Sequence, residues 1–404
     1  MAQARLTQHA VGQGGLWSGE LNAGVDPVRW IYDCGSNQAD SLLREINSMG
    51  AGPIDLLFLS HLDNDHVNGI DLLLGACPVR EVVLPYLERG NLLLVVGEEL
   101  AAGRLTETFR SFIADPVAWL RARGVAQVTF VRPTGEDDDT PPDLPDGPDP
   151  LGQGSLEVKW SKPPRPIIRG WARGGRTAAQ GDVVRLKVQD ISAVADWVFI
   201  PQVHLPTIAR AKAFQRALKV EFPGEDIDKI VTRALDQTGR RKLRTAYDTL
   251  SKDHNKITMS LYAGPYPSSK SNWTAKFDWH PQVTDPSHTY FFFWFHGGDS
   301  GEVGWLSSGD ADLSTPRRRG AFLKFYHSVL TGVGVFILPH HGSAGSFDTS
   351  LLAGMPALRI GIAAAGPNGY GHPHAQVRDA VNKACLFIQV DEREPSSFTC
   401  TLKS

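Results

Sequence analysis

The chain has 404 residues, of which 42% are hydrophobic and 21% charged, as expected of a globular protein that buries a sizeable core. Its formal net charge of −3 excludes a general attraction to nucleic acid, so any basic binding surface must be local. No apolar run reaches the length of a membrane span and no export signal precedes residue 30. We therefore expect a cytoplasmic protein that makes no membrane contact.

The cysteine pattern supports this expectation. Four cysteines occur, and none has CxxC or zinc-finger spacing: Cys34, Cys77, Cys385 and Cys400. They are typical of reduced, partly buried thiols rather than of a disulfide framework.

Strands and helices alternate in the first quarter of the chain. The pattern predicts two strands joined by a glycine-rich turn within 5–35, a helix over 38–49, a strand over 54–60, a helix over 67–75 and a strand over 80–85. This alternation indicates an α/β layered fold.

Four potential metal ligands follow the apolar strand 54–59 within six positions: His61, Asp63, Asp65 and His66. Imidazole nitrogens and carboxylate oxygens are the ligands of zinc or manganese in hydrolytic sites. Asp33, which ends an earlier strand, can orient one of these ligands or can belong to an ordinary turn. A helix cap with two incidental histidines is the alternative explanation of the cluster.

Residues 90–254 are predicted to form an insertion in a single domain that spans 1–404. It comprises helices over 90–125, an acidic Pro/Gly loop over 135–154, a basic hairpin over 160–186 and a helical part over 207–254. The insertion can also serve as the binding surface of a partner protein.

The basic hairpin is a candidate nucleic-acid surface. Its cations include Arg165, Arg169 and Arg173, and Trp160 and Trp171 lie among them. Cations that bind phosphates and aromatic rings that stack on bases are what single-stranded nucleic acid requires. A solvent-exposed hairpin that merely happens to be basic explains the same residues.

Three further polar clusters follow predicted strands in the C-terminal half: Asp310, the pair His340–His341, and the pair His372/His374. Each alone has an ordinary explanation as a turn or a hydrogen-bonded histidine. Polar residues at the ends of successive strands can nevertheless converge on one edge of a sheet. Together with the cluster at 61–66 they therefore predict one metal site.

These motifs resemble a known family. The segment 61–66, HLDNDH, resembles the HxHxDH signature of the metallo-β-lactamase superfamily, with Asp63 in place of the second histidine. Together with VGQG (11–14), YDCG (32–35), LSSGDA (306–311), LPHHGS (338–343) and NGYGHPH (368–374), it is similar to the C-terminal metallo-β-lactamase domain of the competence protein ComEC. The resemblance covers residues 5–90 and 255–385.

The resemblance implies a four-layer αβ/βα sandwich with two divalent cations, zinc or manganese, at one edge. It implies that His61 and Asp63 bind one ion, that Asp65 and His66 bind the other, and that Asp310 bridges both. His340 completes the ligands, whereas His341, His372 and His374 face the substrate, with Asp65, His341 and His372 in catalytic roles. The order within each histidine pair stays open.

The resemblance implies a nuclease-like phosphodiesterase that acts on DNA, without the transport function of the membrane relative. Soluble relatives of this kind are often associated with bacterial defence, which is the role we expect. This sequence departs from the superfamily pattern in two ways. No clear histidine corresponds to the third motif of the superfamily, for which His204 is the sole candidate. In addition, the Asp63 carboxylate gives the first ion site a harder donor atom than the imidazole nitrogen of a standard zinc pocket.

Two alternative functions remain open. A small-molecule hydrolase of the same fold would act on a cyclic nucleotide, a lactone or a thioester, and a deep apolar pocket at the metals would favour it. A non-catalytic scaffold would bind a partner through the insertion at 90–254.

Overall fold

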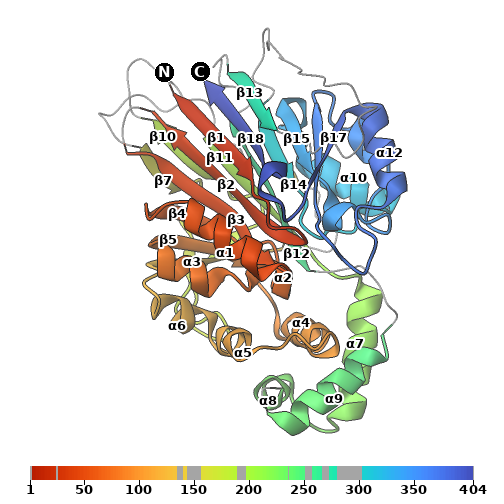
Figure 1. Ribbon diagram of the computed structural model, residues 1–404. Helices are drawn as coiled ribbons and strands as arrows, with labels where there is room; N and C mark the ends of the chain where they lie inside the picture. Colours follow the sequence, from red (N-terminus) through yellow and green to blue (C-terminus); the bar gives the residue numbers. More distant parts are fainter. Residues whose placement is uncertain are drawn as a thin grey trace.

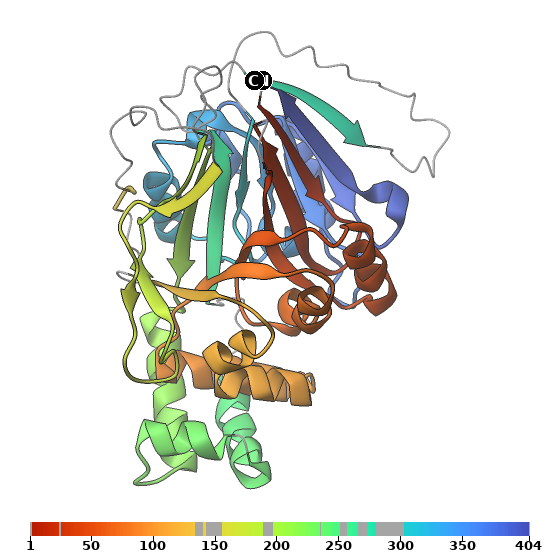
Figure 2. The ribbon, with the colours of Figure 1, turned by 90° about the vertical axis from the view of Figure 1, so that its left-hand side faces the viewer.

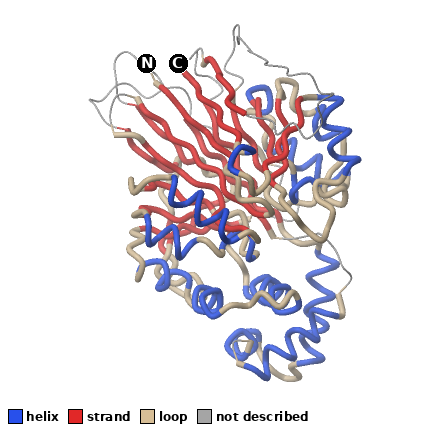
Figure 3. Tube along the Cα trace, viewed as in Figure 1, coloured by secondary structure: helices blue, strands red, loops and turns tan. Residues whose placement is uncertain are grey.

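The computed structural model describes residues 2–23, 26–133, 140–142, 156–188, 197–234, 236–250, 257–265, 273–279 and 303–403. In this part of the chain two mixed β-sheets lie face to face, and helices cover their outer sides (Figures 1 and 2). Strands form the interior and helices the periphery, as Figure 3 shows. The αβ/βα sandwich predicted from the sequence is confirmed.

The first sheet begins at its outer edge with the C-terminal strands and ends with short strands from the middle of the chain. Its order within the described residues is β13 (Thr274–Trp279), β18 (Phe398–Lys403), β1 (Gln3–Gln8), β2 (Gly14–Asn22), β3 (Val28–Ser36), β4 (Ile54–Phe58), β5 (Val79–Pro85), β6 (Gln127–Arg132), β9 (Arg176–Ala179) and β8 (Arg165–Pro166). Strands β3, β4, β5, β6 and β9 are parallel neighbours. Their carboxyl ends therefore share one edge of the sheet.

The second sheet has the order β17 (Leu386–Val390), β16 (Ile360–Ala364), β15 (Val333–Ile337), β14 (Gly304–Ser307), β12 (Thr258–Pro265), β11 (Trp197–His204), β10 (Val184–Val188) and β7 (Leu156–Trp160). Strands β14 to β17 are parallel, whereas β7, β10, β11 and β12 pair antiparallel.

The main core lies between the sheets and is rich in aromatic rings. The ring centroids of Trp30 and Phe199 are 5.0 Å apart, and those of Phe58 and Phe199 are 5.3 Å apart. Every residue of β4 is buried, because the second sheet covers one of its faces and helices cover the other. Its continuous apolar sequence is what a strand buried on both sides requires.

Helices complete the outer layers. The first sheet carries α1 (Ala39–Ser48) and α3 (Ile70–Ala76), and the second carries α10 (Pro316–Phe325) and α12 (Ala375–Ala384) (Figure 1). A second apolar core forms there, in which Phe322 and Phe325 of α10 pack with residues of the second sheet such as Phe336.

A group of helices projects beyond the edge at which β5 and β11 end. It consists of α4 (Arg89–Ala101), α7 (Ile208–Glu221), α8 (Ile227–Arg233) and α9 (Gln237–Asp248), and we call it the helical cap (Figure 1, bottom). A Cβ atom at Gly97 of α4 would lie only 3.1 Å from the Cβ of Tyr247, so glycine permits the close packing of α4 on α9. Two shorter helices, α5 (Glu107–Ala114) and α6 (Pro116–Arg121), lie between α4 and β6 in the chain.

The segment 90–254 contributes strands to both sheets, so it is not a separate insertion. Strands β6, β8 and β9 extend the first sheet, and β7, β10 and β11 extend the second, so its helices alone lie outside the sheets. The basic segment 160–186 is not a hairpin: β7 pairs with β10 in one sheet, while β8 and β9 between them join the other sheet. The acidic loop predicted at 135–154 lies outside the described residues except for 140–142.

Other differences from the predicted elements are local. Residues 3–36 form three strands rather than two, and β17 and β18 were not predicted from the sequence. Among the described residues, every helix is too short or too polar to cross a bilayer.

Candidate metal centre

Both sheets contribute to a cluster of histidines and aspartates. His61 and Asp63 lie in the loop after β4, and Asp65 and His66 lie in the short helix α2 (Asn64–Val67) that follows. Asp310 follows β14, and His340–His341 follows β15 in a 3-10 turn. All these segments leave the carboxyl ends of their strands, which is why they meet at one edge.

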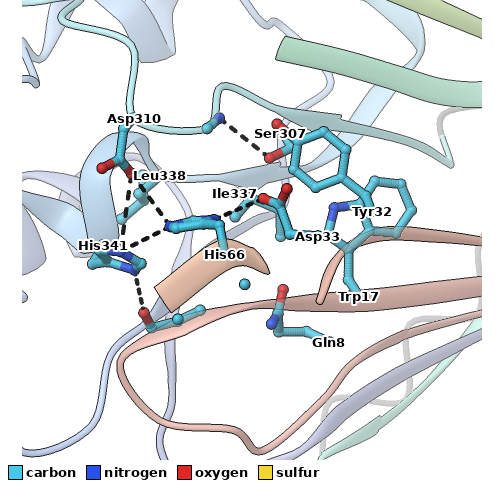
Figure 4. Close-up of a pocket in the computed structure, with 14 residues that line it drawn as sticks. Gln8, Trp17, Tyr32, Asp33, His66, Ser307, Asp310, Ile337, Leu338 and His341 are labelled. Carbon is cyan, nitrogen blue, oxygen red and sulfur yellow. Dashed lines mark hydrogen bonds and ion pairs between the residues drawn. The ribbon is translucent and has the colours of Figure 1, made fainter. Parts of the chain in front are cut away.

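The Asp310 carboxylate joins the two halves of this cluster. Its Oδ2 atom lies 3.5 Å from His61 Nε2 and 3.6 Å from His340 Nε2. Its Oδ1 atom lies 3.8 Å from His66 Nε2 and 3.9 Å from His341 Nε2 (Figure 4). These separations exceed hydrogen-bond lengths but are those of ligand atoms around a cation with bonds of about 2.1 Å.

The other two aspartates lie on opposite sides of Asp310. Asp63 Oδ2 is 3.8 Å from His61 Nε2, and Asp65 Oδ2 is 3.7 Å from His341 Nε2. These contacts divide the cluster around the two Asp310 oxygens, and we call the two parts ligand sets: His61, Asp63 and His340 with Oδ2, and Asp65, His66 and His341 with Oδ1. His66 belongs to both groups of ligand atoms that lie within 4.8 Å of one another, with His61 and Asp310 in one and with Asp65 and His341 in the other. The sets are contiguous, because the Nε2 atoms of His66 and His341 are only 3.4 Å apart.

The donor set fits divalent cations. His61 Nε2 is buried and makes no hydrogen bond, although it faces carboxylate oxygens of Asp63 and Asp310. Three converging carboxylates are unfavourable in a site of low exposure unless a cation compensates their charge. The residues present therefore suit divalent cations.

The buried Asp33 carboxylate fixes two of the histidines. Its Oδ2 atom is 2.8 Å from His66 Nδ1, which leaves Nε2 of that ring facing Asp310. The carboxylate also accepts hydrogen bonds from the amide and hydroxyl of Ser60, and Ser60 Oγ is 2.7 Å from His61 Nδ1. Such a carboxylate behind a histidine sets the tautomer and orientation of a ligand.

His341 is held in the same way by the main chain. Its Nδ1 atom donates to the carbonyl of Ala364 at 2.8 Å, so Nε2 presents its lone pair to Asp65 and Asp310. The geometry thus gives His341 a ligand position. The prediction that assigned the ligand role to His340 and a substrate-facing role to His341 needs this correction, since both Nε2 atoms face Asp310.

Backbone strain is concentrated at this cluster. Within the described residues, the non-glycine residues with positive φ are Asp33 at 60°, His340 at 48° and His341 at 56°. Side chains rarely adopt this region, and it persists where function requires a particular side-chain direction. A Cβ atom at Gly15 would lie 2.7 Å from Asp33 Cβ and from His66 Nδ1, so this glycine lets β2 pass close behind the site.

Local charges shift the proton affinity of the histidines. Burial lowers the pKa of His66, but the carboxylates of Asp33, Asp65 and Asp310 outweigh it and raise that pKa to about 9. Burial lowers the pKa of His341. The negative potential that favours a proton on His66 equally favours a metal cation at its Nε2 atom.

The third histidine pair lies close to His340 and His341. The His372 ring is buried, with its centroid 5.2 Å from that of His340 and 6.4 Å from that of His341. His374 Nδ1 accepts a hydrogen bond from the amide of Ala344, so this ring anchors the loop that carries His340 and His341. The substrate-facing role predicted for His374 stays a prediction.

His204 does not join the cluster. Its Nε2 atom is 2.6 Å from Ser260 Oγ, and its ring packs against Phe322 of α10. Burial, reinforced by Arg318, lowers its pKa to about 3.

The predicted substrate-binding arginines are remote from the cluster. Arg165 lies on β8, four strands away from β4, and Arg169 and Arg173 precede β9. Because β4 and β9 run parallel, the loop before β9 lies at the edge opposite His61.

The tryptophans of the basic segment have structural roles. Trp160 Nε1 donates to Glu81 Oε1, which also pairs with Arg176, and Trp171 Nε1 donates to the carbonyl of Ile113. Neither ring is exposed as a platform for stacking on bases.

A small cavity lies between the sheets behind the cluster (Figure 4). Its volume of about 30 Å³ is that of roughly one water molecule, and Trp17, Tyr32 and Asp33 are among its walls. The cavity is therefore too small to hold a substrate.

Comparison with known proteins agrees with this geometry. Residues 30–166 match the model of the metallo-beta-lactamase superfamily, so this part of the chain is similar to that superfamily. Proteins of this superfamily are generally hydrolytic, and their fold typically binds divalent metals. No curated protein matches the chain.

Three solved structures are similar over much of their length. The metallo-beta-lactamase fold protein YhfI from Bacillus subtilis is 10% identical, with 96% of each chain covered and a TM-score of 0.33. Unliganded yeast PDE1 is 9% identical, with 100% of each chain covered and a TM-score of 0.36. A metallo-beta-lactamase mutant from Cronobacter sakazakii is 14% identical, covers 59% of this chain and 88% of its own, and has a TM-score of 0.21. At these TM-scores none supports an inference about activity.

Replacement of Asp33 by asparagine should weaken metal binding about 10- to 100-fold, because the amide cannot hold His66 and Ser60 as the carboxylate does. Competition with a chromophoric chelator measures this affinity. The exposed Asp40 of α1 provides the matched control, Asp40→Asn, which should bind metal as the wild type does. Equal affinity in Asp33→Asn would contradict the role of Asp33.

Because His204 is buried in its neutral form, the free energy of unfolding should fall as the pH is lowered. Its folded-state pKa of about 3 lies below the unfolded value of about 6.5, so between these values the unfolded chain binds one more proton. In His204→Gln the slope of unfolding free energy against pH between pH 6 and 4 should decrease by up to about 1.4 kcal/mol per pH unit. Urea unfolding measures it. The exposed His327, changed to glutamine, should leave the slope unaltered.

Proposed function

We propose that the chain is a metal-dependent phosphodiesterase that cleaves nucleic acid, with DNA as its substrate. The observation that carries the proposal is Asp310, whose two carboxylate oxygens face separate sets of histidine and aspartate ligands. Such a shared carboxylate would hold a pair of divalent cations, which would supply the chemistry used for in-line displacement at phosphodiesters.

Zinc or manganese would occupy the two ligand sets defined above. When bound, two divalent cations lower the pKa of a water molecule towards neutrality and offset the charge of the phosphodiester. Asp63 replaces an imidazole with a carboxylate in the first set, which favours manganese there.

The protein's own groups hold and complete this arrangement. Asp33 and Ser60 keep the Nε2 atoms of His61 and His66 directed at Asp310. His372 lies against His340 outside the two ligand sets, where a histidine can give a proton to the leaving oxygen. The catalytic role predicted for His372 therefore stays part of the proposal, whereas Asp65 and His341 act as ligands.

Two surface features support a polynucleotide substrate. Tyr370 is 64% exposed, and its ring stacks on His372 with centroids 5.7 Å apart, so it offers a stacking surface beside the cluster. The chain between residues 207 and 250, which forms most of the helical cap, has ten basic and six acidic side chains, although the whole protein is acidic. This local positive charge lies at the same edge as His61, because α4 follows β5 there. The ComEC-like sequence motifs point to the same class of substrate. We also propose that a partner protein binds the helical cap.

One observation favours a second candidate. A groove of about 460 Å³ lies between α2–α3 and α5–α6, next to the ligand loop, with Asn64, Phe109, Phe112 and Trp119 among its walls. An apolar groove of this size would accept the acyl part of a lactone or thioester. Hydrolysis of such esters without cleavage of any phosphodiester would select this alternative.

Asp310→Asn should lower phosphodiesterase kcat/KM by at least about 100-fold, since the amide cannot bridge two cations. Linear DNA, RNA and bis-p-nitrophenyl phosphate in manganese provide the assays. Asp312→Asn, two residues away in the same loop, is the control and should retain activity. Removal of metal by a chelator should abolish wild-type activity, and manganese or zinc should restore it. A wild type that cleaves none of the three substrates would refute the proposal.

Tyr370→Ala should raise KM for single-stranded DNA about five- to tenfold, because stacking on a base contributes about 1–3 kcal/mol. Tyr370→Phe keeps the ring and should behave as the wild type does. Steady-state cleavage of a fluorescent oligonucleotide measures both variants. Unchanged KM in Tyr370→Ala would show that DNA does not contact this ring.

A further inference from the structure

An arginine outside the ligand sets is fixed in place near the metal centre. Arg104 follows α4, and its Nη2 and Nε atoms donate to Glu99 Oε1 and Oε2 at 2.6 and 3.2 Å. Glu99 is completely buried, whereas the Arg104 side chain is 28% exposed. The amide of Arg104 also donates to the carbonyl of Glu99, so the main chain and the side chain are both anchored.

The segment that carries Arg104 lies beside the loop that carries Asp63 and Asp65. Thr106, two residues after Arg104, lines the same groove as Asn64, which separates the two aspartates in sequence. Helix α4 leaves the edge at which β4 and β5 end, as the ligand loop does.

The charge of the Arg104 guanidinium agrees with its position beside the loop that carries Asp63 and Asp65. Burial lowers the pKa of Arg104, but Glu99, Asp63 and Asp65 outweigh it and raise the pKa. The guanidinium therefore stays charged within the electrostatic field of two of the metal-centre carboxylates.

A purely structural role explains these contacts incompletely. A buried ion pair contributes little net stability, because the cost of desolvating both charges offsets their attraction, and an apolar pair of similar size serves as well. Arginine is, however, the residue best suited to bind phosphate, since its planar donors match phosphate oxygens and stay charged. Two of its nitrogens bind Glu99, and Nη1 takes no part in that pair.

We propose that Arg104 forms an anion subsite beside the metal centre, which binds a non-bridging oxygen of the substrate phosphate, and that Glu99 is its positioning residue. This inference rests on the proposed phosphodiesterase function and names the group that recognises the phosphate. A subsite outside the ligand sets would lower KM without altering how the metals are held.

The test uses inorganic phosphate and bis-p-nitrophenyl phosphate with the metal-loaded protein. Arg104→Gln alone leaves Glu99 buried without its partner and can impair folding, so the double variant Glu99→Gln/Arg104→Gln removes both charges together. Arg110, which forms an exposed ion pair with Glu107 on α5, provides the matched control Arg110→Gln. Thermal unfolding and metal analysis accompany each protein.

In the double variant, the calorimetric Kd for phosphate and the KM for the diester should each rise about tenfold or more, with kcat and metal content near wild type. Arg110→Gln should change none of these. A phosphate Kd within twofold of wild type in a folded, metal-loaded double variant would overturn the subsite, even if diester hydrolysis persists. If the wild type hydrolyses no diester but its phosphate affinity still depends on Arg104, the subsite stands and the proposed function fails.

Discussion

Three carboxylates, those of Asp63, Asp65 and Asp310, meet in a place that solvent scarcely reaches, and their mutual repulsion is the constraint on which the site depends. Neutral imidazoles cannot balance this charge, so the folded chain must either hold protons there or bind cations. Asp33, together with Asp65 and Asp310, raises the pKa of His66 to about 9, which shows how negative its surroundings are. Divalent cations relieve it at neutral pH, because each brings two positive charges to atoms already directed at it.

The two sheets must keep a fixed spacing for the ligand side chains to meet, because His61 comes from one sheet and Asp310 from the other. Hydrogen bonds tie the sheets together directly behind the site. Tyr32 Oη donates to the carbonyl of Met259 at 2.6 Å, and the amide of Met259 donates to the carbonyl of Ser60 at 2.6 Å. Ser60 in turn binds the carboxylate that orients the histidines, so the junction between the sheets and the support of the site are one network.

Much of this could be predicted from the sequence, because polar residues that follow apolar strands must gather where strands end. The convergence of Asp310 with His61 and of both with His340–His341 follows from that rule. Side-chain direction could not be predicted: which nitrogen of His341 faces Asp65 depends on a bond to Ala364, on another strand. Local composition also misled for the basic segment 160–186, whose tryptophans bond within the fold. Arg104 was missed, although Glu99, which falls on the same helix face as Leu92, Val95 and Val96, was a signal that a cation lay nearby.

The central claim is that two cations share Asp310, and anomalous scattering tests it most directly. Crystals grown with manganese, with data recorded above the manganese absorption edge, locate each ion independently of any activity. The account predicts two peaks about 3.5–4 Å apart, one on each side of the Asp310 carboxylate. Peaks elsewhere in the molecule, with none within bonding distance of Asp310, would contradict it.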